Sequence, residues 1–383
     1  MKKVEVILKV TEACNLRCKY CYNGENSYTK GVLSLERFEK LLKVLKTGYD
    51  VIHLIWHGGE PLCAGIDYFR KAMDIERKVF INNSVIIENS IQTNATLINS
   101  EWIKFFKEFD FKVGISFDGI NNDKYRDQSN KVLKAIKMLN DAKMRFGCNA
   151  VVADDEYSLK ENYEYFKSLN IPFDFSRVLP EGVAKDNVSV GAIGYAESLN
   201  NLFDEWIYDR DGVSIRTFAT YLSMVSGGKY RICSFCSCHM KYLSITPEGT
   251  IYNCGRSSMS KYPFGNIDDF NTITDIFSSA SALELIKGSI KRREKCKVSC
   301  EYFNLCAGGC TDIAILENGL ENIPTEYCYI FKTVYSHVKK VYHEIIANKV
   351  PLSKLNPTVK SIFANNLFKT VDLMENQIAD TYI

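Results

Sequence analysis

Short apolar segments alternate with helix-like segments along the first 180 residues. Six segments have the apolar runs of buried strands, at 4–10, 51–56, 85–92, 111–117, 146–152 and 173–179. Between and after them, apolar residues recur every three or four positions, which predicts helices at 33–45, 68–80, 100–109, 131–144, 158–169 and 195–208. Such alternation indicates an α/β fold with a parallel sheet. Six units are fewer than the eight of a closed barrel, so we expect an open, partial (β/α)6 barrel.

The pattern changes near residue 230. Cysteines, short apolar pairs and turn signals then predominate as far as Cys328, which predicts a loop-rich, cysteine-rich region. Beyond it, apolar residues again repeat every three or four positions, which predicts a packed helix, at Phe331, Val334, Tyr335, Val338 and Val341. We therefore expect three regions: a partial barrel at 1–215, a cysteine-rich domain at 216–335 and a helical C-terminal tail at 336–383.

Charge and hydropathy exclude several classes of partner. The 383 residues include 48 Lys and Arg against 46 Asp and Glu, so net charge does not indicate a nucleic-acid-binding protein. The segment 1–6 carries charges within its apolar run, unlike a signal peptide. The chain has no uncharged stretch of the ~20 residues that a membrane span needs. We expect a cytoplasmic protein with neither nucleic acid nor membrane as a partner.

The fourteen cysteines suggest metal binding. In a reducing cytosol, clustered thiols are typical of metal sites rather than disulfides. Three lie near the N-terminus and nine lie between Cys233 and Cys328, while Cys63 and Cys148 stand apart and are interpreted as core cysteines. Only five histidines are present, so zinc or iron–sulfur sites are favoured over His-rich metal sites.

The first cysteine motif follows the first expected strand. Cys14, Cys18 and Cys21 have the spacing Cys-x3-Cys-x2-Cys. Three ligands on a four-iron cluster leave one iron open to a cofactor. The alternative is a zinc site, for which Cys63 is the candidate fourth ligand. The motif resembles that of the radical S-adenosylmethionine (SAM) superfamily, in which an aromatic residue, here Tyr20, precedes the last cysteine.

Further segments resemble SAM-binding motifs of the same superfamily. Gly58-Gly59-Glu60-Pro61 resembles the GGE motif, in which the backbone and Glu hold the SAM amino group and glycines allow close approach to the ligand. The resemblance implies further SAM contacts at later strand ends, at Gln92, Asn94, Ser116, Asp118 and Arg126. Arg126 would pair with the SAM carboxylate. Two alternatives remain: Asp118 as a helix cap and Arg126 as a surface residue.

The second cysteine set resembles the SPASM domain of radical SAM enzymes that modify peptides and proteins. The resemblance implies two auxiliary four-iron clusters, hence three [4Fe-4S] clusters in all. Auxiliary cluster I would use Cys238, Cys254, Cys310 and either Cys233 or Cys236, with Cys233 favoured because its longer spacing reaches around a cluster more easily. Auxiliary cluster II would use Cys296, Cys300, Cys306 and Cys328. The family pattern has two residues between the cysteines at 296 and 300, whereas this chain has three. Structural zinc sites are the alternative.

The resemblance implies cleavage of SAM to a 5′-deoxyadenosyl radical, with a flavodoxin or ferredoxin as electron donor. Maturation of a ribosomally made precursor peptide is the favoured function, through cross-linking or another oxidation of its side chains. The alternative is anaerobic sulfatase maturation, which forms formylglycine from Cys or Ser. Enzymes of that kind carry an Asp, which acts as a proton-accepting base, directly after the cysteine corresponding to Cys254. This chain has Gly255 at that position. An alternative from another functional class is an iron–sulfur electron-transfer protein, which would not need the SAM-type motifs.

Overall fold

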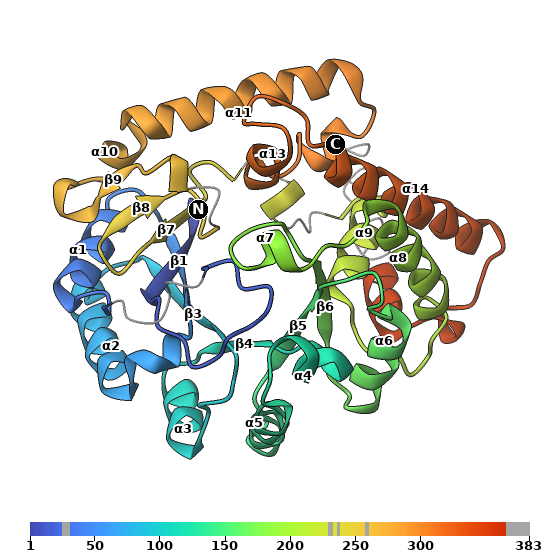
Figure 1. Cartoon of the computed structure of the whole chain (residues 1–383), viewed down its shortest axis with the longest axis horizontal. Helices are drawn as coiled ribbons and strands as arrows, with labels where there is room; N and C mark the ends of the chain where they lie inside the picture. The colour runs from blue at the N-terminus through green and yellow to red at the C-terminus, as the bar shows by residue number, and fades with distance from the viewer. Residues whose placement is uncertain (25–30, 229–232, 236–237, 257–259, 365–383) are drawn as a thin grey trace, which may run out of the picture.

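The computed structural model describes residues 1–24, 31–228, 233–235, 238–256 and 260–364. Six parallel strands form an open arc (Figure 1), in the order β6-β5-β4-β3-β2-β1. Their bounds are β1 (Lys3–Thr11), β2 (Val51–Gly58), β3 (Ile86–Thr93), β4 (Lys112–Ser116), β5 (Phe146–Val152) and β6 (Phe173–Arg177). The expected partial barrel is confirmed, and each expected strand agrees within two residues.

Helices cover the outer face of this arc (Figure 1). They are α1 (Leu35–Leu45), α2 (Ile66–Phe80), α3 (Ser100–Glu108), α5 (Ser129–Asp141), α6 (Leu159–Ser168) and α8 (Ala192–Trp206). Two short helices, α4 (Asn122–Tyr125) and α7 (Ala184–Asn187), belong to the segments that follow β4 and β6. Several begin at an N-cap whose side chain accepts a backbone N–H, as at Ser34, Asn99 and Ser158. Their apolar faces are buried against the sheet, which explains why periodicity located them.

The second region extends the same sheet. β7 (Tyr242–Ile245) pairs in parallel with β1, on the edge that β2 does not occupy. β8 (Thr250–Tyr252) and β9 (Gly265–Asn266) continue from β7 in antiparallel pairing. The strand that leads to the first cysteine motif therefore has one neighbour from the barrel and one from the cysteine-rich region.

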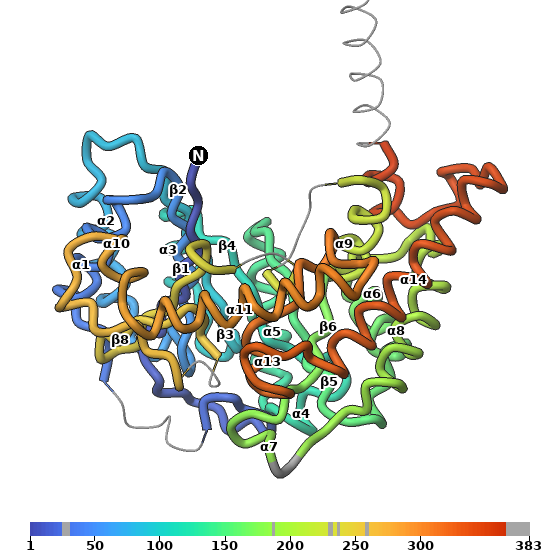
Figure 2. Tube along the Cα trace, turned by 90° about the horizontal axis from the view of Figure 1, so that it is seen from above, coloured from blue at the N-terminus to red at the C-terminus, as the bar shows by residue number. Residues whose placement is uncertain are grey.

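The cysteine-rich region contains a 20-residue helix, α11 (Ala280–Ser299), which the sequence pattern did not predict. In both overall views it starts near α10 (Ile273–Phe277) and passes beside α13 (Thr311–Glu317) before it ends (Figures 1 and 2). The sequence pattern missed it because polar Arg292 is buried while Ile290 and Val298 are exposed. The buried guanidinium of Arg292 donates hydrogen bonds to the backbone oxygens of Gly308 and Leu320.

The C-terminal helix α14 (Thr325–Ala347) returns to the barrel side of the molecule, where it packs against α8 and α9 (Arg216–Val225). All five apolar positions of the expected stripe are buried, from Phe331 to Val341. The helix runs through residue 335, so the expected boundary between the cysteine-rich domain and the tail falls inside one element. A short helix, α12 (Phe303–Cys306), lies between α11 and α13 in the chain. Among the described residues, no helix has the length and apolar character of a membrane span.

Candidate active site

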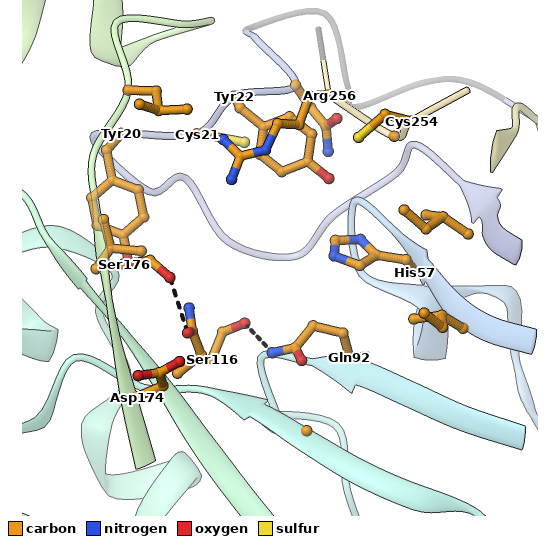
Figure 3. A pocket seen from close by; sticks show the side chains of 18 of the residues that line it. Tyr20, Cys21, Tyr22, His57, Gln92, Ser116, Asp174, Ser176, Cys254 and Arg256 are labelled. Atoms are coloured by element: carbon orange, nitrogen blue, oxygen red, sulfur yellow. Dashed lines mark hydrogen bonds between the residues drawn. The ribbon is translucent and has the colours of Figure 1, made fainter. Parts of the chain in front are cut away.

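A cavity of about 780 Å³ lies where the barrel strands end and the cysteine-rich region begins (Figure 3). Its lining includes all three cysteines of the first motif, Cys14, Cys18 and Cys21. Among the expected SAM contacts it includes Tyr20, Gly58, Gly59, Gln92, Asn94, Ser116 and Arg126. Cys233, Cys238, Cys254 and Cys310 line the same cavity. The fold therefore brings together two sets of cysteines that are more than 200 positions apart in the sequence.

The two glycines after β2 allow contact between two backbone segments. A Cβ at Gly58 would lie 2.1 Å from the Thr11 carbonyl oxygen, and one at Gly59 would lie 2.4 Å from that of Glu12. The Gly59 amide donates to the Thr11 carbonyl at 2.9 Å. The absence of a side chain at these two positions therefore lets β2 approach the chain that leads into the cysteine loop, and the expected approach to a ligand stays a prediction.

Glu60 lies behind the cavity wall rather than in it, as does Pro61. The Glu60 carboxylate is fully buried and accepts hydrogen bonds from Thr93 Oγ1 at 2.7 Å and the Asn94 amide at 2.7 Å. Burial raises its pKa above the usual range. This carboxylate links the loop after β2 to the end of β3, and the expected contact of Glu60 with SAM stays a prediction.

The polar residues at the ends of β3 and β4 are linked to one another. Gln92 Nε2 donates to Ser116 Oγ at 2.9 Å, and Figure 3 shows this pair on the cavity wall. Asn94 Nδ2 donates to Asn15 Oδ1 at 2.9 Å, which connects it to the cysteine loop. These two contacts place amide and hydroxyl groups around the space beside the first cysteine motif.

Tyr20, Asp118 and Arg126 form a hydrogen-bonded group. Tyr20 donates to Asp118 Oδ2 at 2.5 Å, and Arg126 Nη1 donates to the Tyr20 hydroxyl at 2.9 Å. The second oxygen of Asp118 accepts from the Val151 amide. Asp118 does not cap the short helical turn that follows it, so that alternative is wrong. It is not among the described residues that line the cavity, and its contact with SAM stays a prediction. Arg126 is a cavity residue rather than a surface one.

The cysteines of the second region fall into two groups. Cys233, Cys238, Cys254 and Cys310 line the cavity, whereas Cys296, Cys300, Cys306 and Cys328 do not. Members of the second group interact electrostatically with one another. The grouping matches the two expected ligand sets, although iron binding by them stays a prediction. Cys236, the other candidate for auxiliary cluster I, lies outside the described residues.

The thiols of both groups are the kind of ligand that holds iron–sulfur clusters. Within the described ranges, no three or more His, Cys, Asp or Glu side chains are spaced to hold one metal ion. Thiolate sets are the usual ligands of four-iron clusters. Burial raises the pKa of Cys14 and of Cys254 to about 12 in each case. Cluster binding would therefore displace protons from these thiols.

Sequence reasoning missed several cavity residues that immediately flank its motifs. Tyr22 follows Cys21, His57 precedes Gly58, and Arg256 follows Gly255; Figure 3 shows all three side chains in the cavity wall. Arg256 Nε lies 3.6 Å from Oδ2 of Asp312, which is almost fully buried. Glu181, on the loop after β6, also lines the cavity. Position next to a motif was the only signal available for the first three, and none existed for Glu181.

Comparisons with known proteins agree with this architecture. Residues 8–166 match the Radical SAM superfamily and residues 236–301 match an iron–sulfur cluster-binding domain named SPASM. A cysteine-type anaerobic sulfatase-maturating enzyme of Clostridium perfringens is 31% identical, over 88% of this chain and 96% of its own. A serine-type enzyme of Bacteroides thetaiotaomicron is 28% identical, over 91% and 94% respectively.

Solved structures give the same result. Native anSMEcpe with bound AdoMet superposes with a TM-score of 0.77 at 29% identity, covering 90% of this chain and all of that one. Streptococcus suis SuiB bound to its precursor peptide SuiA has a TM-score of 0.62 at 18% identity, covering 85% of this chain and 76% of that one, and so shares the fold. The chain belongs to the radical SAM enzymes with a SPASM domain, in the group of maturases that includes the anaerobic sulfatase-maturating enzymes.

Proposed function

We propose that this enzyme oxidises a Cys or Ser side chain of a peptide or protein segment to formylglycine. The observation that carries the proposal is the single cavity that cysteines of both motifs line. The chain is also 31% identical, over most of its length, to a cysteine-type sulfatase-maturating enzyme. The sequence alone favoured maturation of a precursor peptide, because Gly255 replaces the expected base. The comparisons support the alternative function better, since the peptide-bound neighbour SuiB shares only the fold.

Three four-iron clusters and SAM are the proposed cofactors. When bound, they supply a one-electron reductant, a 5′-deoxyadenosyl radical and an electron acceptor. Cys14, Cys18 and Cys21 would hold the first cluster, and Gln92, Asn94, Ser116 and Arg126 would orient SAM beside it. Cys233, Cys238, Cys254 and Cys310 would hold auxiliary cluster I at the cavity. A flavodoxin or ferredoxin is the proposed electron donor.

The residues of the chain also shape the path of the substrate. Figure 3 places Tyr22 and Arg256 between Cys21 and Cys254, so a target side chain entering the cavity meets both. Arg256 is held by Asp312 and keeps about 45% of its side-chain surface exposed, which leaves its donors accessible to a peptide backbone carbonyl.

Precursor-peptide maturation remains the second candidate, because Gly255 has no side chain with which to accept a proton. The test uses anaerobically reconstituted enzyme, SAM, a reductant and two classes of peptide. One class is derived from sulfatases and carries a Cys or a Ser target; the other consists of short cysteine-containing precursor peptides. An aldehyde on a sulfatase-type peptide, trapped with a hydrazine and located by mass spectrometry, supports the proposal. Loss of two hydrogens from a precursor peptide, with no aldehyde on the other class, would contradict it.

A further inference from the structure

The inner face of the barrel extends beyond the cavity, towards the N-terminal ends of the strands. Side chains two positions apart on a strand share one face of the sheet. Ile7 on β1 and Ile55 on β2 line the cavity. Glu5 and His53, two positions earlier, therefore lie on the same inner face, and the strand register pairs them directly. Neither is among the described residues that line the cavity, so this end of the barrel is separate from the site described above.

Glu5, His53 and Ser90 form a chain of two hydrogen bonds across three neighbouring strands. His53 Nδ1 is hydrogen-bonded to Glu5 Oε2, and His53 Nε2 lies 2.8 Å from Ser90 Oγ. β2 pairs with β1 on one side and with β3 on the other, which places the histidine between its two partners. A carboxylate, an imidazole and a hydroxyl are thus connected in the order of a serine catalytic triad.

The charge of Glu5 determines which nitrogen of His53 carries the hydrogen. Burial raises the pKa of Glu5, but the hydrogen bonds and charges of His53 and Lys3 lower it more, so that it lies below its usual value. An ionised carboxylate only accepts hydrogen bonds, so Nδ1 of the ring must be the donor. In the neutral ring Nε2 is then unprotonated and accepts the hydrogen of the Ser90 hydroxyl. This is the state in which a histidine can take a proton from a serine.

Water can reach these three residues. The side chains of Glu5 and His53 are 20% and 16% exposed, and Ser90 is also partly exposed. A hydrogen-bonded network that serves stability alone leaves its serine no more nucleophilic than any other. A serine that donates to a neutral imidazole is activated, because the ring accepts its proton as the oxygen attacks. The reactivity of Ser90 therefore distinguishes the two roles.

Lys112 supplies a cation beside Ser90. The two residues are register partners on β3 and β4, so their side chains are neighbours on one face of the sheet. Lys112 Nζ lies 3.4 Å from Glu88 Oε1, and its side chain is 64% exposed. An ammonium group has three donors, so one can face Glu88 while another meets a carbonyl oxygen that Ser90 attacks. Such a donor stabilises the negative charge that develops on that oxygen.

We propose that Ser90, His53 and Glu5 form a second catalytic site, which hydrolyses small activated esters through an acyl-serine. Ser90 Oγ attacks the ester carbonyl as its proton passes to His53 Nε2. The bond to the leaving oxygen then breaks, and His53 returns the proton to that oxygen, so an alcohol departs. Water gives a proton to His53 as it attacks the acyl-serine. A carboxylic acid leaves, and the same proton returns to Ser90 Oγ. Glu5 is a positioning residue, since it acts through the ring of His53.

The first test treats the reconstituted full-length chain with a fluorophosphonate, which forms a phosphonate ester with an activated serine and releases fluoride. Mass spectrometry of proteolytic fragments locates the label. Ser90 should react about 100-fold faster than Ser168 or more, because a positioned base is typically worth ~10²–10⁴-fold in rate. Ser168 is the internal control, an exposed serine whose hydroxyl donates to the Tyr165 carbonyl oxygen. Comparable rates at the two serines would overturn the inference without the need for any variant.

Variants then test the role of each partner. His53→Gln should slow labelling of Ser90 about 100-fold or more, and should remove its rise with pH, which reports loss of the imidazole proton. Glu5→Gln should slow labelling roughly tenfold or more, because an amide can also donate to Nδ1 and so stabilise the other tautomer of the ring. Circular dichroism checks that each variant is folded. Labelling of Ser90 at the wild-type rate in folded His53→Gln would contradict the proposal.

Turnover is measured with para-nitrophenyl acetate, without SAM or reductant. The rate of Ser90→Ala is subtracted, because free thiols also react with this ester. Above that background, wild type should release more than one equivalent of para-nitrophenol per chain. Labelling of Ser90 without such turnover would show a reactive serine that is not a catalytic site, and would overturn the proposal. Because neither SAM nor a peptide takes part, this result is independent of the proposed function.

Discussion

The Tyr20 hydroxyl and the Asp118 carboxylate lie 2.5 Å apart in the buried wall between the cysteine loop and the end of β4. Tyr20 comes from the first motif and Asp118 from a motif 98 residues later, and neither sequence pattern indicated the contact. Arg126 donates to the same hydroxyl, which places a cation beside the pair. The loop that carries the predicted SAM cluster is therefore attached to the barrel by a charge-assisted hydrogen bond.

Tyr20→Phe should lower the free energy of unfolding by about 1–3 kcal/mol, because it leaves one oxygen of a fully buried carboxylate without its donor. Chemical denaturation of the anaerobic apoprotein measures the change. Tyr208→Phe is the control, since Tyr208 is 46% exposed. Equal stability of the two variants would show that the contact contributes nothing.

Gly58→Ala should prevent proper assembly of the first cluster site. The added methyl group would lie 2.1 Å from the Thr11 carbonyl oxygen, at a φ of +133°. Gly65→Ala is a matched control, because Gly65 also has a positive φ but has nothing within 4 Å of the added methyl group. The control carries only backbone strain, of about 1–3 kcal/mol.

Iron content and 5′-deoxyadenosine formation after reconstitution distinguish these two glycine variants. Gly58→Ala should lose both, while Gly65→Ala keeps its iron and its cleavage activity at a lower melting temperature. Normal iron content in Gly58→Ala would contradict the close approach on which this prediction depends.

The neutral ring of His57, which is partly buried in the cavity wall, should make stability depend on pH. Its pKa falls from an ordinary 6.5 to about 4 in the folded chain. The unfolded chain therefore binds a proton that the folded chain does not. This contribution is fully present above pH 6.5 and is lost as the pH falls towards 4, to a total of about 3 kcal/mol.

Unfolding free energies of wild type and His57→Gln apoprotein, compared at pH 7, 5 and 4, isolate this group from the other titrating residues. The advantage of wild type over the variant should decline as the pH falls. A constant difference across the range would show that His57 is not held neutral by its surroundings.

Reconstituted enzyme should hold about twelve irons per chain, as three four-iron clusters require. Cys310→Ala and Cys306→Ala should each lower the iron content by about one cluster, and the double variant by about two, because these cysteines belong to separate groups. Cys63→Ala should keep full iron and should still cleave SAM. Iron near four per chain, or stoichiometric zinc, would contradict the two auxiliary clusters.

The sequence predicted the barrel well, since its strands are short apolar runs and its helices bury one face. Segments such as Phe146–Val152 are determined by their own hydrophobic pattern. It predicted the cysteine groups through a resemblance, and the fold then brought Cys233 and Cys254 to the same cavity as Cys14.

The features that the sequence could not predict depend on contacts between distant segments. The sequence gives no sign that Glu60 accepts hydrogen bonds from Thr93 Oγ1 and the Asn94 amide, more than 30 residues away. Arg292 looks like a surface residue, but it is buried among the carbonyls of two later loops. Local periodicity predicts neither the partners of Glu60 nor the burial of Arg292, because each depends on how a distant segment of the chain is placed in the fold.

The pairing of β1 with β7 restricts how this protein can be recombined with its relatives. Val6 is paired with Leu243 and Leu8 with Ile245, and all four side chains are buried. A one-residue slip of β7 would turn Leu243 and Ile245 to the opposite face of the sheet. The cysteine-rich segment therefore cannot be exchanged freely between enzymes. A chimera that takes this segment from another enzyme has to preserve the four-residue pairing of β1 with β7. Otherwise the loop that begins at the end of β1 loses its support.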